Sequence, residues 1–166
     1  MKQIKVQELT LEAFEKYGSF ADFVHPTGEI IGTPGSTVEF YRDKLFIPTT
    51  GDATGLSVTK SMRRPLTIVK AEYHDNCCEA FMPLNGDVYI HVAPATSHDT
   101  VPYDKFEVFR VPQGTMIVLR PGVWHHAPYA IDTEYVSNLC VLPERTYAKD
   151  CVAVDIPEDM QMEIVP

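Results

Sequence analysis

The chain has 166 residues, of which 45% are hydrophobic and 22% are charged. This length predicts a single domain, 1–166, that buries enough apolar surface to fold without disulfides or a structural metal, and the composition excludes disorder. With 14 basic and 23 acidic residues the formal net charge is −9, which argues against nucleic-acid or membrane partners. No segment approaches the ~20 apolar residues needed to cross a bilayer, and no signal peptide is recognisable. We expect a soluble, cytoplasmic protein that acts on a small molecule.

The four cysteines are predicted to be free thiols. Cys77 and Cys78 are adjacent, which is a poor geometry for a bond between them, and Cys140 and Cys151 complete no zinc-finger spacing. Free thiols are the usual state in a reducing compartment. A nucleophilic role for Cys77 or Cys78 lacks an assigned base.

One early segment is predicted to be helical. Thr10 is a candidate N-cap, and Gly18 ends the segment. The apolar residues between them have near-helical spacing: Leu11, Phe14 and Tyr17. Residues 27–61, rich in Gly, Thr and Pro, are expected to form loops or an edge flap over the main fold, with a candidate strand at 38–42.

From residue 66 onward the pattern is a series of β-strands. The 13 prolines and 9 glycines are spread along the chain, which disfavours long helices. The predicted strands are 66–74, 79–84, 87–93, 106–111, 115–119, 124–130 and 135–142. Asn85-Gly86 predicts a hairpin turn, and residues 156–160 a short helical turn. Short strands at this spacing, without intervening helices, indicate an antiparallel sandwich or barrel.

The chemistry-bearing side chains gather in two patches. Glu72 and His74 are two residues apart on a strand and share a face, and Glu79 on the next strand can face the same interior. Of the adjacent histidines only one can point inward, so we expect His125 in the cavity and His126 turned away from its centre. Imidazoles and carboxylates that converge in this way suit metal binding or acid–base chemistry. Three other histidines have no supporting pattern and are expected to be structural: His25, His91 and His98.

These residues resemble the cupin motifs. The spacing from His74 through Glu79 to Gly86 is similar to the latter part of the first cupin motif. The second motif is matched by three residues at its usual offsets: Gly114, Gly122 and His125. Glu72 stands where cupins commonly place their first histidine, and Arg120 where proline is usual. The resemblance implies a single-domain, all-β, cupin-like antiparallel β-barrel (a double-stranded β-helix) with a short N-terminal helix.

A narrower resemblance is to the ureidoglycolate lyase family. It rests on Glu-Tyr-His at 72–74, Glu-Ala-Phe-Met-Pro-Leu at 79–84 and Gly-Val-Trp-His-His-Ala-Pro at 122–128. The likeness is strongest over 66–142 and thinner over 1–20. It implies an enzyme, a carbon–nitrogen lyase that cleaves ureidoglycolate to glyoxylate and urea in allantoin and purine breakdown, and a homodimer, as such barrels often are.

The substrate of that family is a carbinolamine, so a base must take its hydroxyl proton while an acid protonates the departing urea nitrogen. Arg120 offers a forked contact for the substrate carboxylate. His126 is a second candidate substrate-binding residue, although strand alternation turns it from the centre of the cavity. The catalytic candidates for the acid–base chemistry are Glu72, His74, Glu79 and His125.

A divalent metal held by His74, Glu79 and His125 could instead polarise the substrate oxygens. The family commonly has Gln where this chain has Glu79, and a carboxylate adds charge that an amide lacks, which favours metal here. Nickel, zinc and manganese are not distinguished by this pattern, and a metal-free acid–base site is the alternative. Two other function classes stay open: a metal-dependent cupin enzyme of the isomerase type acting on another small polar carboxylate, and a non-catalytic small-ligand-binding cupin.

Overall fold

The computed structural model describes residues 1–49, 53–97 and 100–166, so the expectation for His98 lies outside the described residues. The described chain is mostly β-structure. The strands are β1 (Lys2–Glu8), β2 (Gly18–Asp22), β3 (Ile30–Ile31), β4 (Phe40–Tyr41), β5 (Thr54–Met62), β6 (Thr67–Ile68), β7 (Lys70–Tyr73), β8 (Glu79–Pro83), β9 (Val88–Ala93), β10 (Glu107–Val111), β11 (Thr115–Leu119), β12 (Trp124–His125), β13 (Tyr129–Ala130), β14 (Tyr135–Pro143), β15 (Val152–Asp155) and β16 (Met162–Val165). The helices are α1 (Leu11–Phe14), α2 (Thr146–Lys149) and the 3₁₀ turn η1 (Glu158–Met160). Within these residues no helix has the length and apolar character needed to span a membrane.

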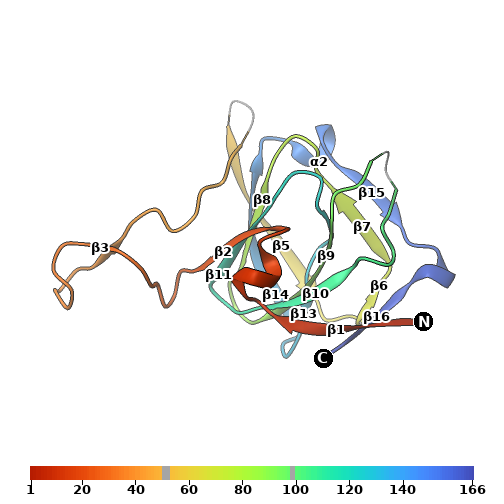
Figure 1. Ribbon diagram of the computed structural model, residues 1–166, viewed down its shortest axis with the longest axis horizontal. Coiled ribbons are helices and arrows are strands. Elements are labelled where there is room, and N and C mark those ends of the chain that lie inside the picture. Colours follow the sequence, from red (N-terminus) through yellow and green to blue (C-terminus); the bar gives the residue numbers. More distant parts are fainter. Residues whose placement is uncertain (50–52, 98–99) are drawn as a thin grey trace.

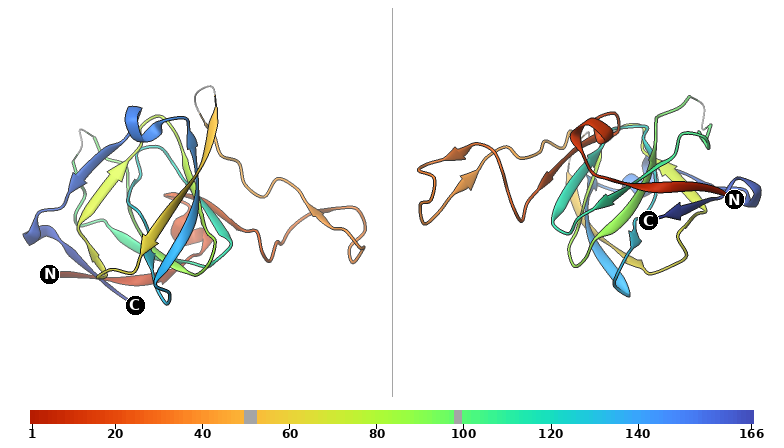
Figure 2. Two further views of the ribbon diagram at one scale, coloured as in Figure 1. Left: turned by 180° about the vertical axis from the view of Figure 1, so that it is seen from behind. Right: turned by 60° about the horizontal axis from the view of Figure 1, so that its bottom comes forward.

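Two curled sheets face one another and form the body of the molecule (Figure 1). The larger sheet has the order β15-β7-β12-β9-β10-β1-β16-β6, with β13 also paired to β9. The smaller sheet has the order β2-β11-β8-β14-β5. Strands β3 and β4 form a separate hairpin, which projects from the body in each view of Figure 2.

The space between the sheets is filled by apolar side chains from both. Val88, Ile90 and Val92 of β9 pack there with Phe81 of β8 and Ile117 of β11. A second apolar cluster covers the other face of the larger sheet, where β9 is buried along its whole length. β9 is therefore buried on both faces, and β12, which carries His125, pairs with it.

The larger sheet is mixed, whereas the sequence predicted an antiparallel barrel. β1 runs parallel to β10 on one side, with Val6 opposite Val108, and parallel to β16 on the other, with Ile4 opposite Ile164. Both partners lie about a hundred residues or more along the chain. No short-range pattern reports such a pairing, because a parallel pair is joined by a long crossover rather than a turn.

The helix and turn predictions had different outcomes. The Thr10 hydroxyl accepts a hydrogen bond from the Ala13 N–H at 3.3 Å, so Thr10 is the N-cap of α1, which ends earlier than expected. Asn85-Gly86 does not close a hairpin, because β8 and β9 belong to different sheets. The Asn85 carboxamide oxygen instead accepts from the Ser137 N–H at 2.7 Å, which ties the crossover to β14.

The expectation of loops through 27–61 was wrong at its C-terminal end. β5 is nine residues long and pairs with β14 at nine successive positions. Its sequence alternates small and polar residues with apolar ones, and the long partner strand supplies the hydrogen bonds that local propensity did not indicate. The candidate strand at 38–42 is reduced to β4. All four cysteines are free, as predicted.

Candidate active site

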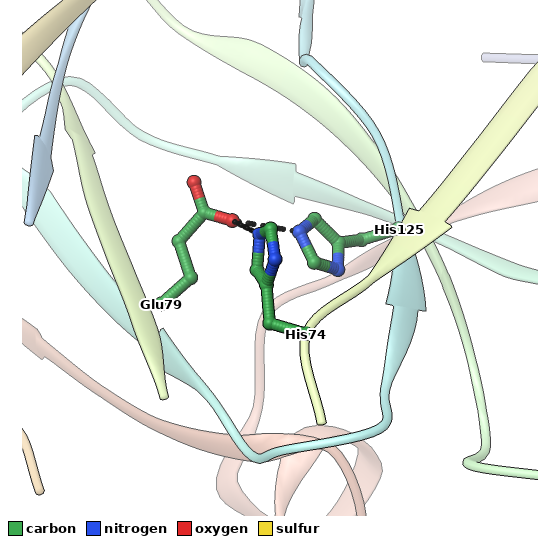
Figure 3. Close-up of side chains that lie close together, drawn as sticks. All are labelled: His74, Glu79 and His125. Carbon is green, nitrogen blue, oxygen red and sulfur yellow. Dashed lines mark hydrogen bonds and ion pairs between the residues drawn. The ribbon is translucent and has the colours of Figure 1, made fainter. Parts of the chain in front are cut away.

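Three separate segments bring His74, Glu79 and His125 together (Figure 3). His74 follows the last residue of β7, Glu79 begins β8, and His125 ends β12. Because β12 pairs with β7, with His125 opposite Glu72, the two histidines reach the interior from neighbouring strands. The Nε2 atoms of His74 and His125 lie 3.1 and 2.7 Å from the same Glu79 oxygen, Oε2.

Both imidazoles have a defined tautomer, because each Nδ1 faces a backbone carbonyl. His74 Nδ1 lies 2.5 Å from the Asp150 carbonyl oxygen, and His125 Nδ1 lies 2.8 Å from that of Val123. A carbonyl only accepts, so each Nδ1 must carry a hydrogen. Each Nε2 is therefore left facing the Glu79 carboxylate. Two acceptors at these distances need a proton or a metal cation between them.

The loop that carries His74 is fixed from two sides. The Asp150 carboxylate accepts hydrogen bonds from the backbone N–H groups of Asp75 and Asn76, both at 2.9 Å. The His74 carbonyl accepts from the Gly122 N–H at 2.7 Å, which links this loop to the turn before β12. These contacts hold the imidazoles in place, as outer partners of metal-ligating or catalytic histidines do.

The electrostatics of the cluster favour an ionised carboxylate between protonated imidazoles when no metal is bound. Burial alone would raise the pKa of Glu79, but hydrogen bonds from His125 and His74 outweigh burial and lower it to about 2. Burial alone would lower the pKa of His74 and His125, yet the hydrogen bond and charge of Glu79 raise both. The carboxylate of Glu79 therefore favours the protonated form of both imidazoles.

A cavity of about 50 Å³ opens beside the cluster, lined by Thr59, Glu72, Glu79, Phe81, His125, His126, Ala127, Pro128 and Cys140. His126 lines this cavity, which corrects the expectation that it turns away. β12 ends at His125, so the alternation of a strand does not extend to His126. Burial, opposed by the charge of Glu72 and assisted by that of Arg64, lowers the pKa of His126 and so favours its neutral form.

Arg120 is not brought into the cavity. Its side chain is exposed, and it is absent from the cavity lining. The cation that the sequence did not single out is Arg64, which donates to the carbonyls of Ala127 and Pro128 at 2.6 and 2.9 Å. Its guanidinium also lies 3.9 Å from the centre of the Tyr129 ring. Arg64 thus holds one wall of the cavity in place, a role for which the sequence offered no signal.

Two histidines expected to be structural lie apart from the cluster. His25 is exposed beside Asp22, and His91 is fully buried, with Nε2 donating to the Lys70 carbonyl at 3.1 Å.

A family model described as ureidoglycolate lyase matches residues 1–163 of this chain. The chain belongs to the ureidoglycolate lyase family. Ureidoglycolate lyases of Escherichia coli O139:H28 and of E. coli K12 are each 26% identical to it over 164 residues, covering 94% of this chain and 96% of the relative. The family and a lyase activity, both predicted from the sequence, are confirmed.

Among solved structures, the 3,4-ketoisomerase QdtA from Thermoanaerobacterium thermosaccharolyticum is similar over 81% of this chain and 85% of its own, with 16% identity and a TM-score of 0.49. A dTDP sugar isomerase from Desulfovibrio desulfuricans covers 86% and 85%, with 15% identity and a TM-score of 0.48.

Proposed function

We propose that the protein cleaves ureidoglycolate to glyoxylate and urea, and that residues 1–166 form one cupin-like barrel domain of a cytoplasmic homodimer. The observation that carries the reaction is the family match over nearly the whole chain. The His74–Glu79–His125 cluster and the cavity beside it supply groups suited to that reaction. Free thiols throughout agree with a reducing compartment.

The acid–base roles follow from the protonation states. Glu79 has a pKa of about 2 and is a weak base at neutral pH, whereas the lowered pKa of His126 favours its neutral, proton-accepting form. His126, assisted by Glu72, takes the proton of the substrate hydroxyl, and the resulting oxygen forms the aldehyde carbonyl as the carbon–nitrogen bond breaks. The imidazolium of His125 delivers a proton to the departing nitrogen, so that urea leaves neutral. His126 gains one proton and His125 loses one, so the proton passes from His126, whose pKa is lowered, back to His125, whose pKa is raised, before the next turnover.

The same cluster fits a divalent metal. The ligand atoms of His74, Glu79 and His125 lie within 4.8 Å of one another, and both imidazoles have Nδ1 tied to a carbonyl with Nε2 left for coordination. Two imidazoles and one carboxylate suit nickel, zinc or manganese. A bound ion would supply Lewis-acid polarisation of the substrate oxygens. The cavity accommodates an ion or a water beside Glu79, so most of the substrate must lie toward its mouth.

The experiment is an assay of glyoxylate release from ureidoglycolate by protein purified without chelator, by chelated protein and by protein resupplied with each metal. Elemental analysis measures metal per chain. Glu79→Gln should lower both metal content and rate, whereas His126→Gln should lower the rate and keep the metal. His25→Gln, at an exposed histidine outside the cluster, is the matched control and should match wild type.

Release no faster than spontaneous breakdown in every metal state would refute the lyase reaction. Calorimetric binding of ureidoglycolate without turnover would then favour the non-catalytic binding class. Full activity of the chelated protein without bound metal would assign the chemistry to the side chains alone.

A further inference from the structure

A second and larger cavity opens further along the segment that walls the candidate active site. Residues 126–128 line the smaller cavity described above, whereas residues 130–132 line a cavity of about 470 Å³. Its other walls include residues 63–66, which lead from β5 to β6, and Tyr89 of β9. None of the three clustered residues of the candidate active site lines it. Its volume is in the range of sites that bind small molecules.

Tyr89 presents an unpaired hydroxyl to this larger cavity. The residue is only 8% exposed, yet within the described part of the chain its hydroxyl has no hydrogen-bond partner. Buried polar side chains are nearly always hydrogen-bonded, because an unpaired one loses its bonds to water without replacement. The hydroxyl is not sealed off from solvent, so a molecule in the cavity can reach it. Burial, opposed by the charge of Arg110 and assisted by that of Asp132, raises the pKa of Tyr89, so the hydroxyl keeps a proton to donate.

Opposite charges line the same cavity without pairing. Arg63 and Arg64 are cationic and Asp132 is anionic, and the described residues include no ion pair between Asp132 and either arginine. The Arg64 guanidinium uses one N–H on each of Nη1 and Nη2 for the carbonyls of residues 127 and 128, which leaves further N–H groups for another acceptor. A molecule that carries both a negative and a positive group would therefore find a partner for each.

The remaining walls of the larger cavity are mostly apolar. Leu66 and Ile131 line it, and both pack against the apolar cluster on the outer face of the larger sheet. Pro65 and Ala130 add further apolar surface. In small-molecule sites a few polar groups fix the orientation of the ligand, while apolar walls bury most of its surface. A molecule that fits this cavity should therefore have an apolar body as well as two charged groups.

We infer that the larger cavity binds a small zwitterion with an apolar body, which is the chemistry of an α-amino acid with an apolar side chain. Its carboxylate would accept hydrogen bonds from the Tyr89 hydroxyl and the Arg64 guanidinium, and its ammonium group would pair with Asp132. Its side chain would lie on Leu66 and Ile131. This binding site is separate from the proposed reaction and does not depend on it.

Arg64 links the larger cavity to the candidate active site. The residue lines the larger cavity, and its guanidinium donates to the carbonyls of Ala127 and Pro128 in the wall of the smaller one. A molecule packed against Arg64 excludes water from the guanidinium, and hydrogen bonds strengthen where water is excluded. Occupancy should therefore stabilise that wall and raise kcat/KM for glyoxylate release about twofold. This link rests on the proposed function, whereas the binding itself does not.

The test measures binding of L-phenylalanine by calorimetry and ligand-observed NMR. Tyr89→Phe removes only the hydroxyl and should weaken binding about tenfold, because a hydrogen bond to a carboxylate is lost. Asp132→Asn should weaken it by about the same factor, through loss of the ion pair. The matched controls Tyr147→Phe and Asp159→Asn, at exposed positions outside the cavity lining, should bind as wild type does. The Tyr89 hydroxyl has no partner within the described residues, so Tyr89→Phe should keep the melting temperature of wild type.

Two analogues identify the group that each residue binds. L-Phenylalaninamide lacks the carboxylate and N-acetyl-L-phenylalanine lacks the ammonium charge, so both should bind wild type more weakly than phenylalanine does. Asp132→Asn should not weaken binding of the N-acetyl analogue any further. Absence of phenylalanine binding up to about 10 mM would overturn the site. Equal affinity of wild type and Tyr89→Phe, or an amide that binds as tightly as the acid, would overturn the placement of the carboxylate.

Glyoxylate release with and without saturating phenylalanine tests the link through Arg64. The rise in kcat/KM should occur in wild type and should be lost in Tyr89→Phe at the same phenylalanine concentration. Binding of phenylalanine with an unchanged kcat/KM would overturn the link. Absence of any glyoxylate release would instead refute the proposed reaction, and the calorimetric result would still decide the binding site.

Discussion

Replacing Glu79 by Gln in the metal-free protein isolates the interaction at the centre of the cluster. The pKa of Glu79 falls from its ordinary 4.5 to about 2. A tenfold change in proton affinity is worth about 1.4 kcal/mol, so the two imidazoles favour the ionised carboxylate by about 3 kcal/mol. The Glu79 side chain is only 14% exposed, so solvent screening reduces this figure little.

The sign of the pH dependence follows from the directions of the three pKa changes. The lowered pKa of Glu79 stabilises the fold above pH 4.5, the ordinary pKa of a glutamate. This stabilisation is lost as the pH falls toward 2. The raised pKa values of His74 and His125 stabilise the fold below pH 6.5, the ordinary pKa of a histidine. This stabilisation is lost as the pH rises through the pKa values that the two histidines have in the folded protein. All three contributions are therefore present together between pH 4.5 and 6.5.

Urea unfolding followed by circular dichroism, with chelator at each pH, measures the effect. Glu79→Gln should lower the free energy of unfolding by about 3 kcal/mol near the middle of that window, and this loss should shrink as the pH rises through the folded-state pKa values of His74 and His125. Glu15→Gln, at an exposed carboxylate on the surface, should change it by less than about 0.5 kcal/mol throughout. A loss that stays the same across the whole alkaline titration would refute the ionised cluster.

Three further outcomes are expected. Arg64→Ala removes charged hydrogen bonds to the cavity wall at Ala127 and should lower kcat/KM for glyoxylate release about tenfold. The control Arg63→Ala, at the exposed neighbouring residue, should leave kcat/KM unchanged. Equal kcat/KM values for the two variants would show that Arg64 does not support the cavity wall. In Gly18→Ala the new Cβ would lie 1.8 Å from a backbone oxygen of β11, so a fall of several degrees in the melting temperature is expected, and an unchanged melting curve would contradict the close approach. Burial raises the pKa of Cys77 to about 11, so alkylation at about pH 8, read by mass spectrometry, should label it only after unfolding; rapid labelling of the native protein would count against its burial.

The sequence by itself determined the family and most of the strands from residue 66 onward. It also identified the three clustered residues His74, Glu79 and His125, although their chemical roles stay predictions. These successes share a cause. Alternation along a strand and fixed offsets within a motif are local, and a residue's facing direction follows from its neighbours wherever the strand continues. The same rule failed at His126, because β12 had already ended.

Only the tertiary structure decided the parallel insertion of β1, the long strand β5, the placement of Arg64 against the cavity wall and that of Arg120 outside it. Each depends on pairing between segments far apart in the chain. Such contacts are set by the packing of two whole sheets. The local sequence around the residues that make them therefore looks like the sequence of an ordinary surface loop.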